Sequence, residues 1–287
     1  MRYEAPTSAK EAVSLLAKEK GKAFVLGGGT DLLVKMKAGM VEPDLVVDIK
    51  LIKGMKDIKK TASGFTIGAC VPCAALSENA ALVKAWPGVV EAASLIGSKQ
   101  VQGRCTMAGN LCNASPAADS VPGLVAAGAK AVITGPKGSR KLAIEDVPAG
   151  VGRTNLKKAE FITAIELPKK QPKSGDAYLR FIPRSEMDIA VVSVGVNLTI
   201  DGKGVVTKAR VALGAVATTV LLVKDAAKAI IGTKLDAEAL AKLANAASAA
   251  CKPIDDKRGT VAFRTEVAGV LARRAAETAY ARAGGKI

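Results

Sequence analysis

The 287-residue sequence contains no histidine, and this absence excludes several kinds of site at once. Without an imidazole there is no Ser-His-Asp triad, no His-ligated zinc, no haem held by a proximal histidine and no histidine general base. An enzyme that contains this chain therefore depends on a bound cofactor or on a partner subunit for its chemistry. At roughly 150 residues per domain, the length predicts about two domains.

Long apolar runs and an export signal are also missing. The opening MRYEAPTSAKEA is polar, and even the apolar stretch VALGAVATTVLLV is shorter than a membrane span and is followed by Lys224. The five cysteines are an odd number in a long chain, which is typical of proteins kept in a reducing compartment. We expect a soluble, cytoplasmic protein that makes no membrane contact.

Aromatic residues are scarce, at 3% of the chain, whereas 42 Lys and Arg outnumber 26 Asp and Glu and give a formal net charge of +16. A basic chain can bind nucleic acid by neutralising phosphates. However, the basic residues are scattered in short pairs such as Lys59-Lys60 and Arg273-Arg274, and few aromatic rings are present to stack on bases. A lysine-rich solvated surface, or a surface that faces an acidic partner, is favoured over nucleic-acid binding.

The first fifty residues alternate between helical and extended patterns around a glycine-rich turn. A capped helix ends at Gly21, and strands at 23–26 and 45–49 flank a second helix that ends at Gly39. The turn after the first strand joins it directly to the second helix. This turn is therefore a candidate binding loop.

Three consecutive glycines begin the turn at Gly27, and Thr30 and Asp31 complete it. Glycines permit positive φ and leave backbone amides uncovered, and the next helix adds its dipole, so the turn suits a phosphate or diphosphate group. It is not the Rossmann fingerprint, because Leu32 stands at the third glycine position, nor a Walker loop, because no Gly-Lys-Ser/Thr follows. A tight turn with a purely structural role is the alternative interpretation.

A long segment from Gly97 to Asp119 is rich in small and polar residues and shows no clear periodicity, so we expect an irregular loop. From Thr106 onward it combines side chains that form short-range hydrogen bonds with small residues that permit close approach. A long irregular segment inside a compact domain is more often functional than structural filler. Asp119 and Ser120 also suit the N-cap of the following helix.

The rest of the chain is predicted to form helices and strands on both sides of a linker, and the part after the linker is predicted to form a second domain. Helices are predicted at 73–83, 89–95, 120–128, 220–231, 236–251 and 264–283, and strands at 65–69, 131–134, 161–167, 177–184, 189–200 and 205–215. The polar segment 169–175, which contains Pro172, is the predicted linker. Strands followed by helices after this linker predict an α+β C-terminal domain.

Six segments of the chain, in this order, match the pattern of one protein family: GGGTDLL, IGSKQVQGRCT, TMAGNLCNASPAADS, YLRFIPRSEMDIAVVSVGV, ARVALGAVA and PIDDKRG. They resemble the FAD-binding (medium) subunit of the molybdenum hydroxylases, which include aerobic CO dehydrogenase and xanthine dehydrogenase. The first and third are similar to the family's usual AGGTDLL and TIGGNIANASPAADT. The resemblance covers nearly the whole chain, and six ordered segments are more specific than one glycine motif.

The resemblance implies an α+β fold with two domains. The first is an FAD-binding domain of two small α+β subdomains, of the vanillyl-alcohol-oxidase/PCMH-like type. It spans residues 1–170, with subdomains of about 1–55 and 56–170. The second, a C-terminal domain of antiparallel sheet plus helices, spans residues 176–287.

The resemblance also implies thirteen contacts to FAD: Gly27, Gly28, Gly29, Thr30, Asp31, Ile96, Thr106, Ala108, Gly109, Asn110, Asp119, Ile162 and Arg180. By this resemblance the first loop binds the diphosphate through backbone amides, and Asp119 holds the adenosine part. Arg180 lies near the flavin ring, where a cation favours the anionic reduced flavin. An exposed charge at a strand edge is the alternative interpretation of Arg180.

Two positions depart from the family pattern. Ala108 replaces a glycine and adds a methyl group where close approach to the cofactor is expected. Gly27 replaces an alanine and loses nothing sterically. The contact at Ala108 is therefore weaker as an expectation than the contact at Gly109.

The spacings Cys70-x-x-Cys73 and Cys105-x6-Cys112 raise the question of a zinc or iron–sulfur site. Neither matches a standard pattern, and the family that the chain resembles keeps its [2Fe-2S] clusters on a separate small subunit. The iron–sulfur insertion of the relatives that reduce an aromatic acyl-CoA is absent from this sequence. We predict buried free thiols and no metal ligands in this chain.

Together these features predict the FAD-carrying electron-transfer subunit of a cytoplasmic molybdenum hydroxylase. The resemblance implies a large subunit with the molybdenum cofactor, a small subunit with two [2Fe-2S] clusters, and a dimer of heterotrimers. Electrons would leave FAD to NAD+, a quinone or oxygen, and no residue of this chain is expected to be catalytic toward the organic substrate. A stand-alone flavin-dependent oxidase and a basic nucleic-acid-binding module are the alternatives.

Overall fold

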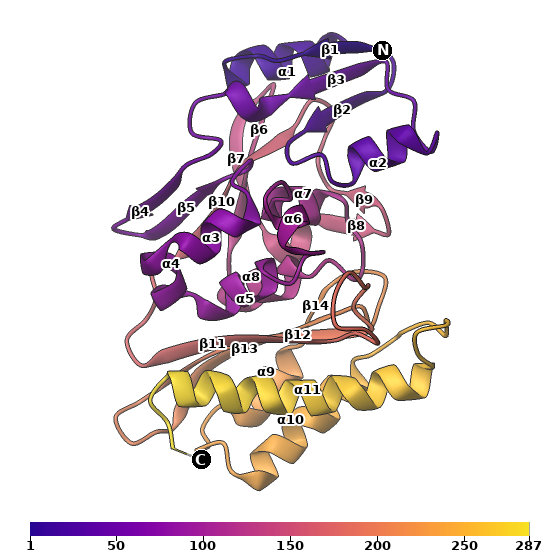
Figure 1. Ribbon diagram of the computed structural model, residues 1–287. Helices are drawn as coiled ribbons and strands as arrows, with labels where there is room; N and C mark the ends of the chain where they lie inside the picture. Colours follow the sequence, from indigo (N-terminus) through magenta and orange to yellow (C-terminus); the bar gives the residue numbers. More distant parts are fainter. Residues whose placement is uncertain (287) are drawn as a thin grey trace.

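A computed structural model describes residues 1–286 of the chain and divides their strands among four sheets. Sheets of three, five and four strands follow one another from top to bottom of Figure 1, and a short two-stranded hairpin lies beside them. Among the described residues, none of the helices combines the length and the apolar content that crossing a membrane requires.

The first sheet is parallel and is built from a β-α-β-α-β run. Its elements are β1 (Arg2–Glu4), α1 (Ala9–Lys18), β2 (Ala23–Leu26), α2 (Leu32–Lys37) and β3 (Leu45–Asp48). β3 lies in the middle, so β2 is an edge strand. The glycine turn follows the carboxyl end of β2, and ligands of parallel sheets commonly bind at this end of the strands.

The second sheet is antiparallel, with the strand order β4-β5-β10-β6-β7. Its strands are β4 (Ile58–Thr61), β5 (Gly64–Gly68), β6 (Lys130–Gly135), β7 (Gly138–Ala143) and β10 (Phe161–Pro168). The central strand is therefore the last of the five in the sequence. The small hairpin of β8 (Pro148–Gly150) and β9 (Arg153–Thr154) precedes it.

Six short helices lie between the second and third sheets in Figure 1. They are α3 (Cys73–Glu78), α4 (Ala80–Ala85), α5 (Pro87–Ala93), α6 (Lys99–Gln102), α7 (Met107–Cys112) and α8 (Ser120–Ala127). Every residue of α8 is buried, because this helix packs on the second sheet and on the third. Gly128 ends it in the left-handed conformation typical of a helix C-terminus.

The third sheet is antiparallel and carries the C-terminal helices. Its strands are β11 (Ser174–Phe181), β12 (Val192–Ile200), β13 (Val206–Gly214) and β14 (Leu221–Leu222). The helices are α9 (Lys224–Ile230), α10 (Ala237–Ala249) and α11 (Val261–Arg282). In Figure 1, α11 runs along the face of this sheet opposite to α8, where its buried alanines pack against β11 and β12.

The structure corrects several predicted elements. The segment 97–119 is not one irregular loop, because α6 and α7 form within it. The helix predicted at 73–83 is divided at Asn79, whose side chain accepts a hydrogen bond from the Leu82 amide and so starts α4. The helix predicted at 220–231 begins at Lys224, and β11 begins at Ser174, inside the predicted linker.

Candidate functional site

The first side of the candidate site is the turn between β2 and α2. A Cβ on Gly28 would lie 2.2 Å from the carbonyl oxygen of Arg104, so only glycine fits. Gly29 has a φ of +82°, a left-handed conformation that strains residues with side chains. The turn thus packs its backbone directly against the segment that leads into α7, and the two predicted loops meet.

The backbone amides of this turn are available to a ligand. Within the described residues, none of the amides from Gly27 to Asp31 donates a hydrogen bond to the protein backbone. Lys50 holds the start of the turn, with Nζ 3.3 Å from the Gly27 carbonyl oxygen and 2.7 Å from Asp48 Oδ2. Successive free amides beside a helix N-terminus attract anions, so the turn suits a phosphate group.

Asp48, which pairs with Lys50, is held as a carboxylate. Burial acts to raise its pKa, but hydrogen bonds from Lys50 and Tyr3 outweigh burial and leave the pKa below its ordinary value. The Tyr3 hydroxyl donates to Asp48 Oδ2 at 2.6 Å. This ion pair fixes Lys50 and, through it, the first carbonyl of the turn.

The second side of the site is α7, whose start is defined by local hydrogen bonds. Thr106 caps the helix: its Oγ1 accepts a hydrogen bond from the Gly109 amide at 2.9 Å. Asn110 Oδ1 accepts hydrogen bonds from the amide and the hydroxyl of Ser120, at 3.1 and 2.7 Å. The first turn of α7 is therefore tied to the start of α8.

A cavity of about 430 Å³ lies between these two sides. Its size is typical of small-molecule and cofactor sites. Eleven of the thirteen predicted contact residues line it: Gly27, Gly28, Gly29, Thr30, Asp31, Ile96, Thr106, Ala108, Gly109, Asn110 and Ile162. Residues from positions 27–31, 96–110 and 162 thus converge on one space, although the sequence separates them widely.

Asp119 and Arg180 do not line this cavity. Instead they form a buried ion pair, with Arg180 Nη1 2.9 Å from Asp119 Oδ2, and the Tyr178 hydroxyl donates to Asp119 Oδ1 at 3.1 Å. The Arg180 side chain is only 5% exposed, so it is not the exposed strand-edge charge of the alternative interpretation. Burial raises the pKa of Asp119, although Arg180 and Tyr178 oppose that effect.

Four hydrogen-bonding or charged residues that line the cavity were not predicted from the sequence: Lys35, Asn113, Thr154 and Glu160. Lys35 could have been predicted from the sequence, because it follows Asp31 by four residues and so lies one helical turn beyond the glycine turn. Glu160 could not have been predicted, since nothing in the sequence places the start of β10 beside the glycine turn. Its carboxylate pairs with Arg140, at 3.0 Å from Nε and 2.8 Å from Nη2.

The lining of the cavity fits a flavin dinucleotide. The free amides of the glycine turn suit a diphosphate. Apolar side chains that also line the cavity, among them Phe24, Ile96, Phe161 and Ile162, suit a ring system. The backbone amides and the apolar side chains of the lining therefore match the two chemical parts of such a cofactor.

Comparison with known proteins identifies the family. Residues 1–170 match the family described as "FAD binding domain in molybdopterin dehydrogenase", and residues 177–279 match "CO dehydrogenase flavoprotein C-terminal domain". The chain belongs to this family of molybdopterin dehydrogenase flavoproteins. The carbon monoxide dehydrogenase medium chain of Afipia carboxidovorans is 35% identical over 281 residues, which cover 98% of this chain and 97% of that protein. The xanthine dehydrogenase FAD-binding subunit of Escherichia coli is 27% identical over 288 residues, 99% and 98% of the two chains.

The same relationship is evident in three dimensions. A chain in the crystal structure of a Cu,Mo-CO dehydrogenase, in its cyanide-inactivated form, matches with a TM-score of 0.93 and 35% identity, covering 98% of both chains. The predicted family and the predicted α+β fold class are therefore confirmed. This molybdopterin dehydrogenase flavoprotein is an oxidoreductase subunit with an FAD-binding domain.

Four free cysteines of this flavoprotein line the cavity or lie near it. Cys105 and Cys112 line it, and Cys70 and Cys73 are buried nearby in the same apolar core. Burial raises the pKa of the Cys70 thiol to about 11 and that of Cys112 to about 12, so both are protonated near neutral pH. Within residues 1–286, no three His, Cys, Asp or Glu side chains are grouped as metal ligands would be.

Proposed function

We propose that this chain is the FAD-carrying electron-transfer subunit of a multi-subunit molybdenum hydroxylase. It would take electrons from [2Fe-2S] clusters of a partner subunit and pass them to an external acceptor. The observation that carries this proposal is the convergence of the glycine turn and the start of α7 on one cavity. Family membership supports the same conclusion and favours it over the nucleic-acid-binding alternative.

In this proposal the chain binds and orients FAD, and the bound FAD supplies the redox chemistry. The amides of Gly27, Gly28, Gly29, Thr30 and Asp31 would hold the diphosphate. Further contacts would come from Ile96, Thr106, Ala108, Gly109, Asn110 and Ile162, which line the same cavity. Asp119 and Arg180 would act from outside the cavity wall: Asp119 adjoins Ser120, whose hydrogen bonds hold Asn110.

The proposed partners are a large subunit with the molybdenum cofactor and a small subunit with the iron–sulfur clusters. The relatives support this assembly, because they are named as a medium chain or an FAD-binding subunit and this chain spans nearly their whole length. A Cu,Mo-CO dehydrogenase contains the matching chain. We propose a cytoplasmic complex that is a dimer of heterotrimers, in which the substrate binds to the large subunit.

The decisive experiment is purification of the chain together with its partner subunits. The complex should be yellow-brown and should release FAD, identified by chromatography, when it is denatured. A flavin that is present without any molybdenum or iron–sulfur partner would favour the stand-alone oxidase instead. A complete complex without flavin would contradict the proposal.

A further inference from the structure

Few charged residues line the cavity, and they differ in whether an ion pair neutralises them. Among the described residues, Lys35 is the single Lys or Arg in the lining, and two carboxylates, Asp31 and Glu160, also line it. The Glu160 carboxylate is already neutralised by Arg140. The remaining charges facing a bound anion are therefore the Asp31 carboxylate and the Lys35 ammonium.

Lys35 differs from Lys50, the other lysine near the glycine turn, because none of the described carboxylates forms an ion pair with it. Lys50 is held by Asp48 at 2.7 Å, which neutralises its charge. Within residues 1–286, no carboxylate oxygen lies within ion-pair distance of Lys35, whose Nζ donates to the neutral Asn113 Oδ1 at 2.7 Å. Lys35 is therefore a cation in the cavity wall whose charge is not compensated by a close anion.

The backbone places this ammonium between the two sides of the site. The Lys35 amide donates to the Asp31 carbonyl at 3.0 Å, so Lys35 lies one helical turn beyond the glycine turn. Its half-buried side chain then reaches Asn113 at the end of α7, on the opposite side of the cavity. The Lys35 side chain thus extends from α2, next to the glycine turn, to the end of α7.

We propose that Lys35 is a diphosphate-binding residue of this chain. On cofactor binding, its ammonium would exchange the Asn113 amide oxygen for a phosphate oxygen. This inference rests on the proposed function, and it assigns the cation that balances the charge of the diphosphate. Backbone amides contribute only partial charges, and the Asp31 carboxylate repels a dianion, so a full positive charge at this position adds substantially to affinity.

The test compares three full-length variants in FAD titration, followed by flavin fluorescence, using the assembled complex if the isolated chain does not retain flavin. Lys35→Gln removes the charge, Lys35→Arg keeps it, and Lys37→Gln removes the exposed lysine two residues further along α2, which does not line the cavity. We expect Lys35→Gln to weaken FAD binding by about ten- to hundred-fold. Lys35→Arg should restore most of the affinity, and Lys37→Gln should match the wild type.

Salt and stability measurements separate a phosphate contact from a structural one. If Lys35 pairs with the diphosphate, the FAD affinity of Lys35→Gln will depend less on ionic strength than that of the wild type. The apo forms of both should unfold at similar temperatures. Equal losses in Lys35→Gln and Lys37→Gln, or a loss that follows the unfolding temperature, would overturn the inference. A wild-type chain that binds no FAD in either form would instead overturn the proposed function.

Discussion

Gly28 shows how a single missing side chain lets the glycine turn pack closely against the segment that leads into α7. A Cβ at this position would lie 2.2 Å from the Arg104 carbonyl oxygen, whereas a Cβ at Gly27 would lie 3.7 Å from Cys70 Sγ. The first distance is a clash with backbone and the second is an ordinary contact. The replacement of the family's usual alanine by Gly27 is therefore sterically neutral here.

We predict that Gly28→Ala displaces the turn and lowers the stability by about 1–3 kcal/mol. The FAD content per chain should fall with it, while Gly27→Ala should behave like the wild type. Flavin absorbance relative to protein and the thermal midpoint together check both variants. Full flavin content and an unchanged midpoint in Gly28→Ala would show that the turn does not need this close approach.

Glu160 gives a prediction about acid stability. A hydrogen bond from Arg140 lowers the pKa of this carboxyl below its ordinary value of 4.5. Its contribution to stability is therefore fully present above that value and is lost as the pH falls through the lowered pKa. In urea unfolding, Glu160→Gln should be less stable than the wild type at neutral pH, and the difference should shrink in acid. A difference that stayed constant with pH would contradict this role.

At the scale of the elements, the pair of Asp119 and Arg180 joins the start of α8 to β11. Replacing Arg180 by Met leaves the Asp119 carboxylate buried without its cation, and we expect the free energy of unfolding to fall by about 3–5 kcal/mol. The loss should diminish in acid, because burial already raises the pKa of Asp119 and protonation removes the uncompensated charge.

Arg273→Met is the matched control for this prediction. Arg273 is an exposed residue of α11 and forms no ion pair among the described residues. Chemical denaturation of both variants over a range of pH provides the measurement. Equal and small losses in the two variants would show that the buried pair does not stabilise the join between α8 and β11.

The elements that could be predicted were those with local signals. The strand at 23–26, the glycine turn and the helix after it follow from periodicity and glycine chemistry, and eleven of the proposed contacts line one cavity. The helices α6 and α7 escaped because they are only four and six residues long. What stabilises α7 is its Thr106 cap and the burial of Met107 and Leu111 against other segments, and periodicity does not reveal such contacts.

Other features depended on pairings between distant segments. The resemblance implied that Asp119 holds the adenosine part of FAD and that Arg180 lies near the flavin ring. Their mutual ion pair arises instead from the packing of α8 on the third sheet. Lys35 and Asn113 are 78 positions apart and meet only because α2 and α7 border the same cavity. Such contacts depend on the tertiary structure and leave no local pattern in the sequence from which they could be predicted.

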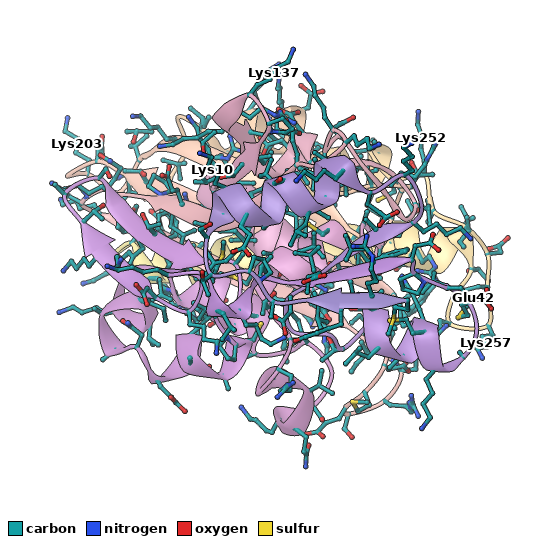
Figure 2. All side chains as sticks on the ribbon, turned by 90° about the horizontal axis from the view of Figure 1, so that it is seen from above. Lys10, Glu42, Lys137, Lys203, Lys252 and Lys257 are labelled. Atoms are coloured by element: carbon teal, nitrogen blue, oxygen red, sulfur yellow. The ribbon has the colours of Figure 1, made fainter. Side chains whose placement is uncertain are left out.

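At the scale of the whole molecule, the positive charge is distributed rather than concentrated. Figure 2 shows Lys137, Lys203, Lys252 and Lys257 at separate places around the outline of the molecule, and Lys10 on α1 near the middle of the same view. Electrostatic attraction between such a surface and acidic partners is screened by salt. We predict that association with the partner subunits weakens as ionic strength rises, as measured by analytical ultracentrifugation of the mixed subunits. An assembly that is indifferent to salt would indicate an interface dominated by apolar contacts.

The central place of β10 in the second sheet has a consequence for the newly made chain. β10 separates β5 from β6, yet it is synthesised after both, so this sheet stays divided into two hairpins until residues 161–168 have left the ribosome. The same strand carries Phe161 and Ile162 into the cavity wall. The cavity wall is therefore incomplete until this strand is inserted, and a nascent chain that stops before it has the glycine turn without a finished cavity.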